Sequence, residues 1–209
     1  MSEQTSIRIL SVDDHPLFRE GIAAVIKSQP DMLLVAEAAS GREAFDRFRE
    51  HRPDVTLMDV RLPDMNGIEA VNAIYAAFPG SRIVMLSTFD GDIEVQRALE
   101  AGAWGFFLKN EPPRDLVEVI RKVHSGKKIV PSSLAVRLAE HLSDEALTTR
   151  EVEVLTEVAK GNRNREIGKR LFISEDTVKR HMSQIMRKLG VGDRTEALTI
   201  AARRGIVQL

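Results

Sequence analysis

The sequence of 209 residues contains no cysteine. The absence of thiols excludes a disulfide framework, thiolate metal sites, iron–sulfur clusters and a cysteine nucleophile. It also fits a reducing cytoplasm, which is the location that we expect. No apolar run approaches the roughly 18–20 residues of a membrane-spanning helix. The polar start MSEQTS lacks the apolar core of a signal peptide, so we expect neither a leader nor a membrane partner.

The net charge is close to zero over the whole chain but not within its two halves. The total is −1, from 30 basic and 31 acidic residues. Residues 1–124 carry a net charge of −6, whereas residues 125–209 carry +5. This asymmetry predicts an acidic module joined to one that prefers a polyanion, although many basic faces are only solvated.

Short apolar runs alternate with amphipathic segments along the first half of the chain. The five runs are 7–12, 32–36, 55–60, 83–87 and 105–108. They are partly β-branched and nearly continuous, as in strands that are covered on both faces. The first amphipathic segment repeats four apolar residues at helical spacing, namely Leu17, Ile22, Val25 and Ile26. Five such strand–helix repeats in about 120 residues predict a doubly wound α/β domain with a parallel sheet.

From Ser125 onward the pattern is helical only. A short amphipathic stretch at 134–142 is expected to form a linker helix. Four further helices are predicted at 149–159, 164–171, 174–189 and 195–204. The chain therefore divides into an α/β domain at 1–124, a linker at 125–145 and an all-α domain at 146–209.

Polar side chains stand at the ends of four of the five predicted strands, at the edge where open α/β sheets bind ligands. The first strand ends in Asp13 and Asp14, the third in Asp59, the fourth in Ser87 and the fifth in Lys109. Three carboxylates at adjoining strand ends repel one another unless a cation joins them, and oxygen-only ligands favour Mg²⁺. A carboxylate beside Mg²⁺ can attack a phosphoryl group, which Lys109 and Ser87 can then bind. Taken singly, Asp14 could be only a helix cap and Asp59 only a turn residue.

These residues resemble the receiver domain of two-component response regulators. The matching motifs occur in order within residues 7–124 and are Val12-Asp13-Asp14-His15, Met58-Asp59-Val60-Arg61-Leu62-Pro63-Asp64-Met65-Asn66-Gly67, Leu86-Ser87-Thr88 and Phe107-Leu108-Lys109. The resemblance implies a sheet of order 2-1-3-4-5 with helices on both faces. It implies that Asp59 accepts a phosphoryl group from the phosphohistidine of a sensor histidine kinase. It further implies Mg²⁺ ligation by Asp13, Asp14, Asp59 and the backbone carbonyl of Arg61.

The same resemblance assigns roles to the residues around the acceptor. Lys109 pairs with the phosphoryl group, and Ser87 moves toward it as the switch hydroxyl. Phe106 occupies the switch aromatic position, where the common tyrosine would add a hydroxyl. A haloacid-dehalogenase-like phosphatase needs a second acid where Arg61 stands, and a dinucleotide site needs Gly-x-Gly-x-x-Gly after the first strand. Neither fits this sequence, and the five histidines show no metal-ligand spacing, so most are expected at the surface.

The basic half of the chain has the pattern of a helix-turn-helix. The helix at 164–171 is followed by a tight turn and by a second helix that Ser174 can cap, with no Glu or Gln three residues later. This second helix is apolar on one side and cationic on another, so its N-terminal half can enter a DNA major groove. The residues predicted to face DNA are Lys179, Arg180, Ser183, Arg187 and Lys188. A solvated basic helix in a protein-binding bundle is the alternative.

Residues 147–209 resemble the LuxR-type helix-turn-helix of the NarL/FixJ response regulators. The matching motifs include Leu147-Thr148-Thr149-Arg150-Glu151, Ile173-Ser174-Glu175, Thr177-Val178-Lys179 and Lys188-Leu189-Gly190-Val191. The resemblance implies a transcription regulator that binds double-stranded DNA as a homodimer when its receiver is phosphorylated. Its only catalysis would then be its own phosphorylation and dephosphorylation. The stretch at 162–165 departs from the usual pattern, which could change phosphate contacts.

Two questions stay open at the level of sequence. The last predicted helix either pairs output domains or belongs to the core, and the residues concerned are Ala197, Leu198, Ile200 and Ala201. The alternative function is a signalling adaptor, in which the receiver competes for phosphoryl groups and the helical domain binds protein. Steep salt dependence of DNA affinity would separate the two functions.

Overall fold

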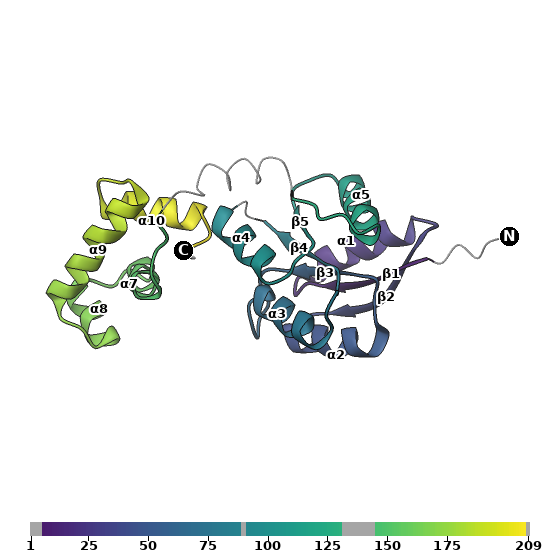
Figure 1. Ribbon diagram of the computed structural model, residues 1–209, viewed down its shortest axis with the longest axis horizontal. Coiled ribbons are helices and arrows are strands. Elements are labelled where there is room, and N and C mark those ends of the chain that lie inside the picture. The colour runs from purple at the N-terminus through teal and green to yellow at the C-terminus, as the bar shows by residue number, and fades with distance from the viewer. Residues whose placement is uncertain (1–5, 89–90, 131–144, 208–209) are drawn as a thin grey trace. The chain divides into compact units, whose positions relative to one another are not determined.

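The computed structural model describes residues 6–88, 91–130 and 145–207. The described residues form two compact units, one with all five strands and one with the four helices that follow residue 145 (Figure 1). Among the described residues, no helix is both long and apolar enough to cross a membrane. The predicted linker helix at 134–142 lies outside the described residues, and the predicted boundaries of the two domains stay predictions.

The sheet of the first unit has the predicted order and direction. All strands are parallel, and their order is β2-β1-β3-β4-β5. The strands are β1 Ile7–Val12, β2 Met32–Ala38, β3 Val55–Asp59, β4 Ile83–Ser87 and β5 Gly105–Leu108. β2 runs two residues beyond its predicted end, while β3 ends at Asp59 itself. Because all strands are parallel, their carboxyl ends meet at one edge.

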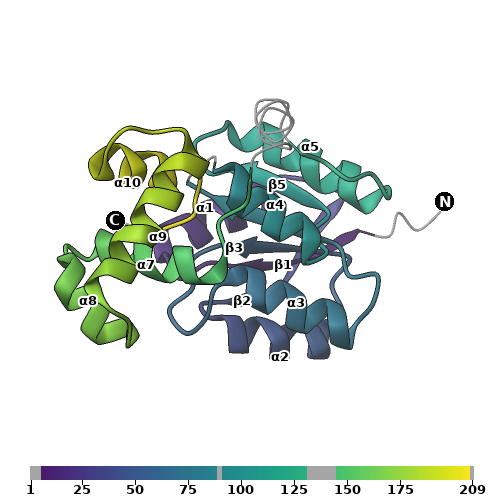
Figure 2. The same ribbon diagram turned by 60° about the vertical axis from the view of Figure 1, so that its left-hand side comes forward.

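Five helices cover both faces of this sheet, as Figures 1 and 2 show. They are α1 Pro16–Lys27, α2 Gly41–His51, α3 Gly67–Ala77, α4 Asp92–Glu100 and α5 Pro113–His124. α1 and α5 cover one face, where Ile22, Ile26 and Ile120 join the buried strand residues Ile9 and Leu57 in one apolar core. α2, α3 and α4 cover the other face. The sheet is therefore buried on both sides, which explains its nearly continuous apolar strands.

One residue of the predicted apolar face of α1 is exposed. Ile22 and Ile26 are buried and Val25 packs on the core, but Leu17 is 83% exposed. Leu17 lies in the first turn of the helix, which begins at Pro16. The helical period correctly predicted the other three residues, and its prediction for Leu17 was wrong.

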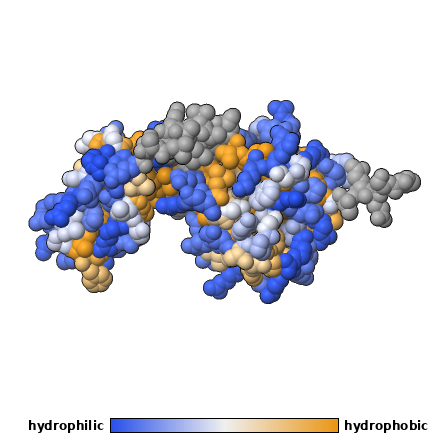
Figure 3. All heavy atoms as spheres, in the orientation of Figure 1, coloured by the Kyte–Doolittle hydropathy of each residue, from blue (hydrophilic) through white to orange (hydrophobic). Residues whose placement is uncertain are grey.

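The second unit contains the four predicted helices. They are α7 Thr149–Ala159, α8 Asn164–Leu171, α9 Glu175–Leu189 and α10 Arg194–Arg203. Ser174 caps α9 as predicted, since its side chain accepts a hydrogen bond from the backbone N–H of Thr177. The other helices of this unit pack against α9, whose Val178, Met182 and Ile185 are buried (Figure 2). Figure 3 shows that hydrophilic residues cover most of the visible surface of both units.

The structure places most of the predicted pairing residues of α10 in the core. Ala197 and Ala201 are completely buried, and Leu198 packs against the same apolar cluster as α9. Ile200 is half-buried. Ala197 and Ala201 therefore belong to the core, whereas a pairing role for the half-buried Leu198 and Ile200 stays a prediction.

Candidate functional site

The carboxyl edge of the sheet brings the predicted acidic residues and the lysine together. Asp13 directly follows β1, Asp59 ends β3, and Lys109 directly follows β5. The Lys109 ammonium is 2.6 Å from Asp13 Oδ2 and 2.7 Å from Asp59 Oδ2, so it bridges the two carboxylates. The backbone N–H of Lys109 also donates to the carbonyl of Ser87 at 2.7 Å, which fixes the end of β5 beside β4. Residues far apart in sequence thus form one charged pocket.

Asp14 completes the acidic cluster and is not a helix cap. His15 is the N-cap of α1 and makes no side-chain capping bond. Oxygen atoms of Asp13, Asp14 and Asp59 and a ring nitrogen of His15 lie within 4.8 Å of one another. Asp14 Oδ1 is buried and lies 2.7 Å from His15 Nδ1, yet it accepts no aligned hydrogen bond from the described residues. A buried carboxylate oxygen with spare capacity, beside two further carboxylates, fits a hard cation such as Mg²⁺.

The electrostatics of the pocket follow from burial. The Asp13 and Asp59 side chains are 0% and 5% exposed. Burial raises the pKa of Asp59 above its ordinary value, and the nearby charge of Asp13 acts in the same direction. The hydrogen bond from Lys109 opposes this rise in the pKa without cancelling it. The pocket therefore holds more negative charge than one lysine neutralises, and added positive charge would stabilise it.

The connection between β3 and α3 fixes the position of Asp59. Asn66 caps α3, and the N–H of Gly67 donates to the carbonyl of Val60 at 2.8 Å. A Cβ atom on Gly67 would lie 1.9 Å from the carbonyl oxygen of Asp59. The N–H of Arg61 donates to Asp59 Oδ1 at 3.3 Å. Only glycine lets α3 begin this close to the acceptor strand.

The helical unit presents a second candidate site along α9. A Cβ on Gly168 of α8 would lie 2.7 Å from the carbonyl of Ile173, so the two helices meet closely at their turn. Lys179, Arg180 and Ser183 lie exposed in the N-terminal and middle parts of α9. This is the geometry of a helix-turn-helix whose second helix carries exposed polar side chains.

Comparison with known proteins matches both units to known families. Residues 9–121 match the model of the response regulator receiver domain, and residues 145–201 match that of the bacterial regulatory proteins of the luxR family. The chain belongs to the LuxR-type response regulators. It is a regulator of transcription with a receiver domain and a DNA-binding output domain.

Curated relatives resemble this response regulator along its whole length. The chain is 41% identical over 214 residues to the uncharacterized transcriptional regulatory protein YxjL of Bacillus subtilis, with 97% of this chain and 98% of YxjL covered. It is 38% identical over 208 residues to the response regulator protein VraR of Staphylococcus aureus, with 97% and 100% covered. The likeness therefore includes both domains.

Solved structures share the same two-domain composition. The response regulator ChrA of a heme-sensing two-component system is 34% identical, with a TM-score of 0.58 and with 96% of this chain and 98% of ChrA covered. A complex of the two-component response regulator RcsB with DNA is 25% identical, with a TM-score of 0.70 and 95% and 99% covered.

The predicted DNA-facing set of this response regulator needs one correction. The Lys188 side chain is only 7% exposed, and its ammonium is 2.9 Å from Glu151 Oε2 and 3.0 Å from the carbonyl of Ala146. It thus binds the N-terminal end of α7 within the domain, and its charge is already used. Arg187, in contrast, is exposed and pairs with Glu145 at 2.7 Å.

Sequence reasoning missed two features of the sites. His15 was grouped with the scattered histidines, although its position directly after Asp13 and Asp14 places it at the acidic cluster. Arg163, Arg165 and Arg194 line one hollow of about 620 Å³ beside the start of α8. Arg163 and Arg165 belong to the stretch that departs from the family pattern, which was the available signal.

The other predicted residues are placed by the structure, and their roles stay predictions. Ser87 is buried at the end of β4, and Phe106 is completely buried in β5, where it lies opposite Met85. Arg61 follows the acceptor strand and pairs with Asn66 in an isolated antiparallel bridge.

Proposed function

We propose that Asp59 of this regulator accepts a phosphoryl group from a sensor histidine kinase in a reaction that needs Mg²⁺. The observation that supports this most strongly is the Lys109 ammonium, which joins Asp13 and Asp59 at the carboxyl edge of the sheet. A buried carboxylate with a lysine at bonding distance has both the nucleophile and the charge that a transferred phosphoryl group requires. Asp13, Asp14, Asp59 and the carbonyl of Arg61 are the proposed metal ligands.

The chemistry is a single displacement at phosphorus. A carboxylate oxygen of Asp59 attacks the phosphorus of the phosphohistidine, a P–O bond forms, and the P–N bond breaks with its electron pair leaving on the imidazole nitrogen. When bound, Mg²⁺ supplies charge that offsets the carboxylates and the phosphoryl oxygens. Lys109 holds one side of the acceptor and then pairs with the new phosphoryl group. Ser87 supplies a hydroxyl that hydrogen-bonds it.

Labelling by acetyl phosphate tests this assignment without the kinase. The wild-type chain should gain one acid-labile phosphoryl group with Mg²⁺ present and none with EDTA, as intact mass measures. Asp59→Asn should abolish the label, whereas the matched control Asp46→Asn, an exposed carboxylate of α2, should label normally. Stoichiometric labelling of Asp59→Asn would refute the site.

The labelling rate should also fall with decreasing pH, because burial raises the pKa of Asp59. Only the unprotonated oxygen of Asp59 can attack, and its raised pKa means that it takes up a proton at higher pH than an ordinary aspartate. At limiting Mg²⁺ the rate should fall with decreasing pH, starting above the ordinary range of aspartate. More Mg²⁺ should move this fall to lower pH, and an unmoved profile would contradict ligation of the metal by Asp59.

We further propose that phosphorylation favours a homodimer whose output domains bind sequence-specific DNA. The groove-facing residues are Lys179, Arg180 and Ser183, with Arg187 further along α9. The Lys179 ammonium is 3.2 Å from Asp176 Oδ1, an exposed pair that DNA phosphates can displace at low cost. Contact with DNA would also place the protein in the cytoplasm. A solved structure of two dimers of the response regulator RcsB bound to two parallel DNAs supports binding of DNA as a dimer.

Arg163, Arg165 and Arg194 are proposed as contacts to the DNA backbone. The three arginines line one hollow, and the first residues of α8 line it as well. Arg194 donates to Asn164 Oδ1 at 2.8 Å and to the carbonyl of Asn162 at 2.6 Å, which orders the rim. Cations beside a helix N-terminus suit phosphate oxygens.

Substitution on α9 should separate DNA contacts from general basic charge. Lys179→Ala and Arg180→Ala should each weaken binding to the cognate operator by about tenfold or more, with a smaller salt slope where a phosphate contact is lost. Lys160→Ala, which removes an exposed lysine on the C-cap of α7, is the matched control and should change binding little. Affinity that does not depend on salt would favour the adaptor function instead.

A further inference from the structure

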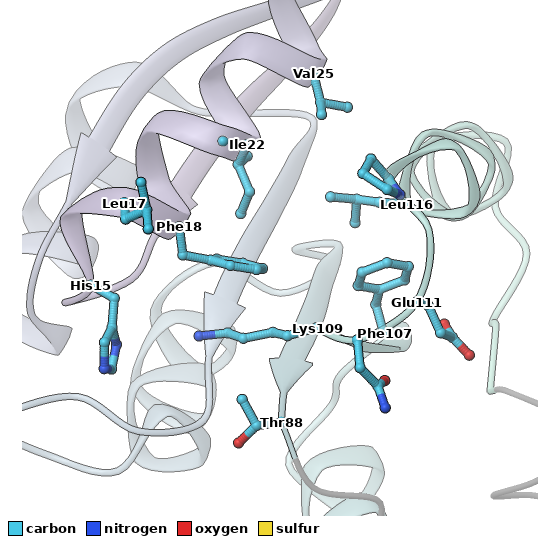
Figure 4. A pocket seen from close by; sticks show the side chains of 13 residues that line it. His15, Leu17, Phe18, Ile22, Val25, Thr88, Phe107, Lys109, Glu111 and Leu116 are labelled. Atoms are coloured by element: carbon cyan, nitrogen blue, oxygen red, sulfur yellow. The ribbon is translucent and has the colours of Figure 1, made fainter.

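Phe172 is the most exposed of the large apolar side chains that the structure describes. The exposed ones among the described residues are Leu17, Leu33, Tyr75 and Phe172. Leu17 borders an apolar groove of the receiver, so its side chain continues an apolar surface (Figure 4). Phe172 is 94% exposed and belongs to neither apolar cluster of the described residues. A single exposed apolar residue is common on protein surfaces, so the exposure of this ring needs a second observation before it indicates a function.

The backbone at Phe172 supplies that observation, because it is left-handed. Phe172 is the C-cap of α8 and has a φ of +55°, a conformation that glycine and asparagine adopt at lower cost than phenylalanine. Among the described residues, Arg52 is the other non-glycine residue with a positive φ, and its guanidinium lies over the Phe78 ring at 4.0 Å. Arg52 thus gains a contact within the chain. The described residues offer Phe172 no comparable contact, so both its backbone and its exposed ring lower stability without a return inside the protein.

Phe172 lies at the end of the stripe of α9 residues that we assign to DNA. It belongs to the turn between α8 and α9, and Ser174, two residues later, is the N-cap of α9. Asp176 precedes Lys179 by three residues and Arg180 by four, so it shares their side of the helix. The Asp176 side chain is 87% exposed. The stripe therefore continues through the first turn of α9 to the turn that holds Phe172.

The side chains at this end of α9 suit base edges better than phosphates. Glu175 and Asp176 are exposed carboxylates, which phosphate oxygens repel. The major groove instead offers the amino group of cytosine, from which a carboxylate can accept a hydrogen bond, and the apolar C5-methyl group of thymine. A phenyl ring beside two carboxylates matches these two kinds of group.

We propose that Phe172 contacts the C5-methyl group of a thymine in the operator and so contributes to sequence preference. The inference rests on the proposed function, because it requires that α9 enters the major groove. It explains why the turn carries a phenyl ring in a left-handed conformation. Glycine or asparagine would suit the backbone there but would remove the apolar group that reaches the base.

A duplex that the full chain selects from a random pool, with acetyl phosphate and Mg²⁺ present, allows this contact to be measured. Replacing one thymine by deoxyuridine removes a single methyl group and keeps the base pair. At one thymine of each half-site this should weaken wild-type binding about fourfold, as expected for one buried methyl group. Phe172→Asn should bind the unmodified duplex at least about fourfold more weakly than the wild type and should not respond to that replacement. Helical circular dichroism should show no loss of stability, because asparagine tolerates the left-handed backbone better than phenylalanine.

Arg52→Asn is the matched control, since it makes the same replacement at the other left-handed residue and should respond to deoxyuridine as the wild type does. If deoxyuridine weakens the wild type and Phe172→Asn equally at every thymine, the ring contacts no methyl group and the proposal is wrong. If Phe172→Asn binds DNA like the wild type but no longer supports transcription by RNA polymerase, the ring contacts the polymerase and the proposal is wrong as well. Failure of the proposed DNA binding would look different, because the wild type would then select no duplex, and this inference would fall with it.

Discussion

Glu151→Ala should destabilise the output domain by about 2–4 kcal/mol while leaving the receiver unchanged. The Glu151 side chain is 3% exposed and accepts hydrogen bonds from the Lys188 ammonium at 2.9 Å and from the N–H of Thr148 at 2.7 Å. Its removal takes the nearer of two carboxylates from a nearly buried ammonium, which keeps only Glu145 at 3.5 Å, and it removes half of the capping box of α7. Both losses act on the contact between α7 and α9, around which the domain is built.

The single tryptophan allows the two domains to be followed separately. Trp104 lies in the receiver, so its fluorescence reports unfolding of that domain, whereas helical circular dichroism also reports the output domain. Urea unfolding of Glu151→Ala should shift only the second signal. Glu153→Ala is the matched control on the same helix, since its exposed pair with Arg150 contributes about 1 kcal/mol or less. Equal stability of the two variants would contradict a structural role for the Glu151–Lys188 pair.

Acid should weaken the same contact. Burial alone would raise the pKa of Glu151, but the hydrogen bonds from Lys188 and Thr148 hold that pKa below its ordinary value of 4.5. A lowered pKa in the folded state means that the carboxylate contributes stability above the unfolded pKa, and that this contribution is lost as pH falls through the folded one. The output domain should therefore lose stability below about pH 4.5, and Glu151→Ala should lose less over the same range.

Periodicity predicted the architecture because each element is short and buried in a regular way. Strands covered on both faces are apolar at nearly every position, so the ends of β1 and β5 were visible where Asp13 and Lys109 interrupt the apolar runs. The predicted run 55–60 passed through Asp59 and ended one residue beyond β3. The order of the strands came from the family resemblance. The meeting of three distant charges followed from parallel strands alone, since their carboxyl ends share one edge.

The predictions for Lys188 and Leu17 failed for a different reason. The type of a residue does not determine which tertiary contacts surround it. Lys188 was assigned to DNA because it is cationic, yet on α9 it follows Ile185 by three residues and so lies at the margin of the buried stripe. A carboxylate 37 residues earlier in the sequence completes its environment. Leu17 was included in the apolar repeat of α1, yet its residue is 83% exposed in the first turn of the helix. Both errors concern tertiary contacts that a helical period cannot contain.

Gly67→Ala should slow phosphorylation of Asp59 strongly without removing any charged group of the acceptor site. The new Cβ would lie 1.9 Å from the carbonyl oxygen of Asp59, 2.9 Å from its carbonyl carbon and 3.0 Å from the Cα of Val60. These are backbone atoms of a buried strand end, so either β3 or the start of α3 must move by an ångström or more. Displacement of this size typically costs a reacting group about a hundredfold in rate. We therefore expect labelling by acetyl phosphate to slow at least about a hundredfold.

A second glycine at a helix start separates this effect from loss of helix geometry. Gly41 begins α2, and a Cβ there would approach the side chain of Met65 at 2.4 Å and no backbone atom among its three nearest neighbours. A methionine side chain can rotate away, so Gly41→Ala should label at nearly the wild-type rate. Trp104 fluorescence during urea unfolding then measures whether the receiver domain of either variant, Gly67→Ala or Gly41→Ala, is destabilised. If Gly67→Ala labels as fast as Gly41→Ala, the connection between β3 and α3 relaxes without moving Asp59, and the position of the acceptor does not depend on this glycine.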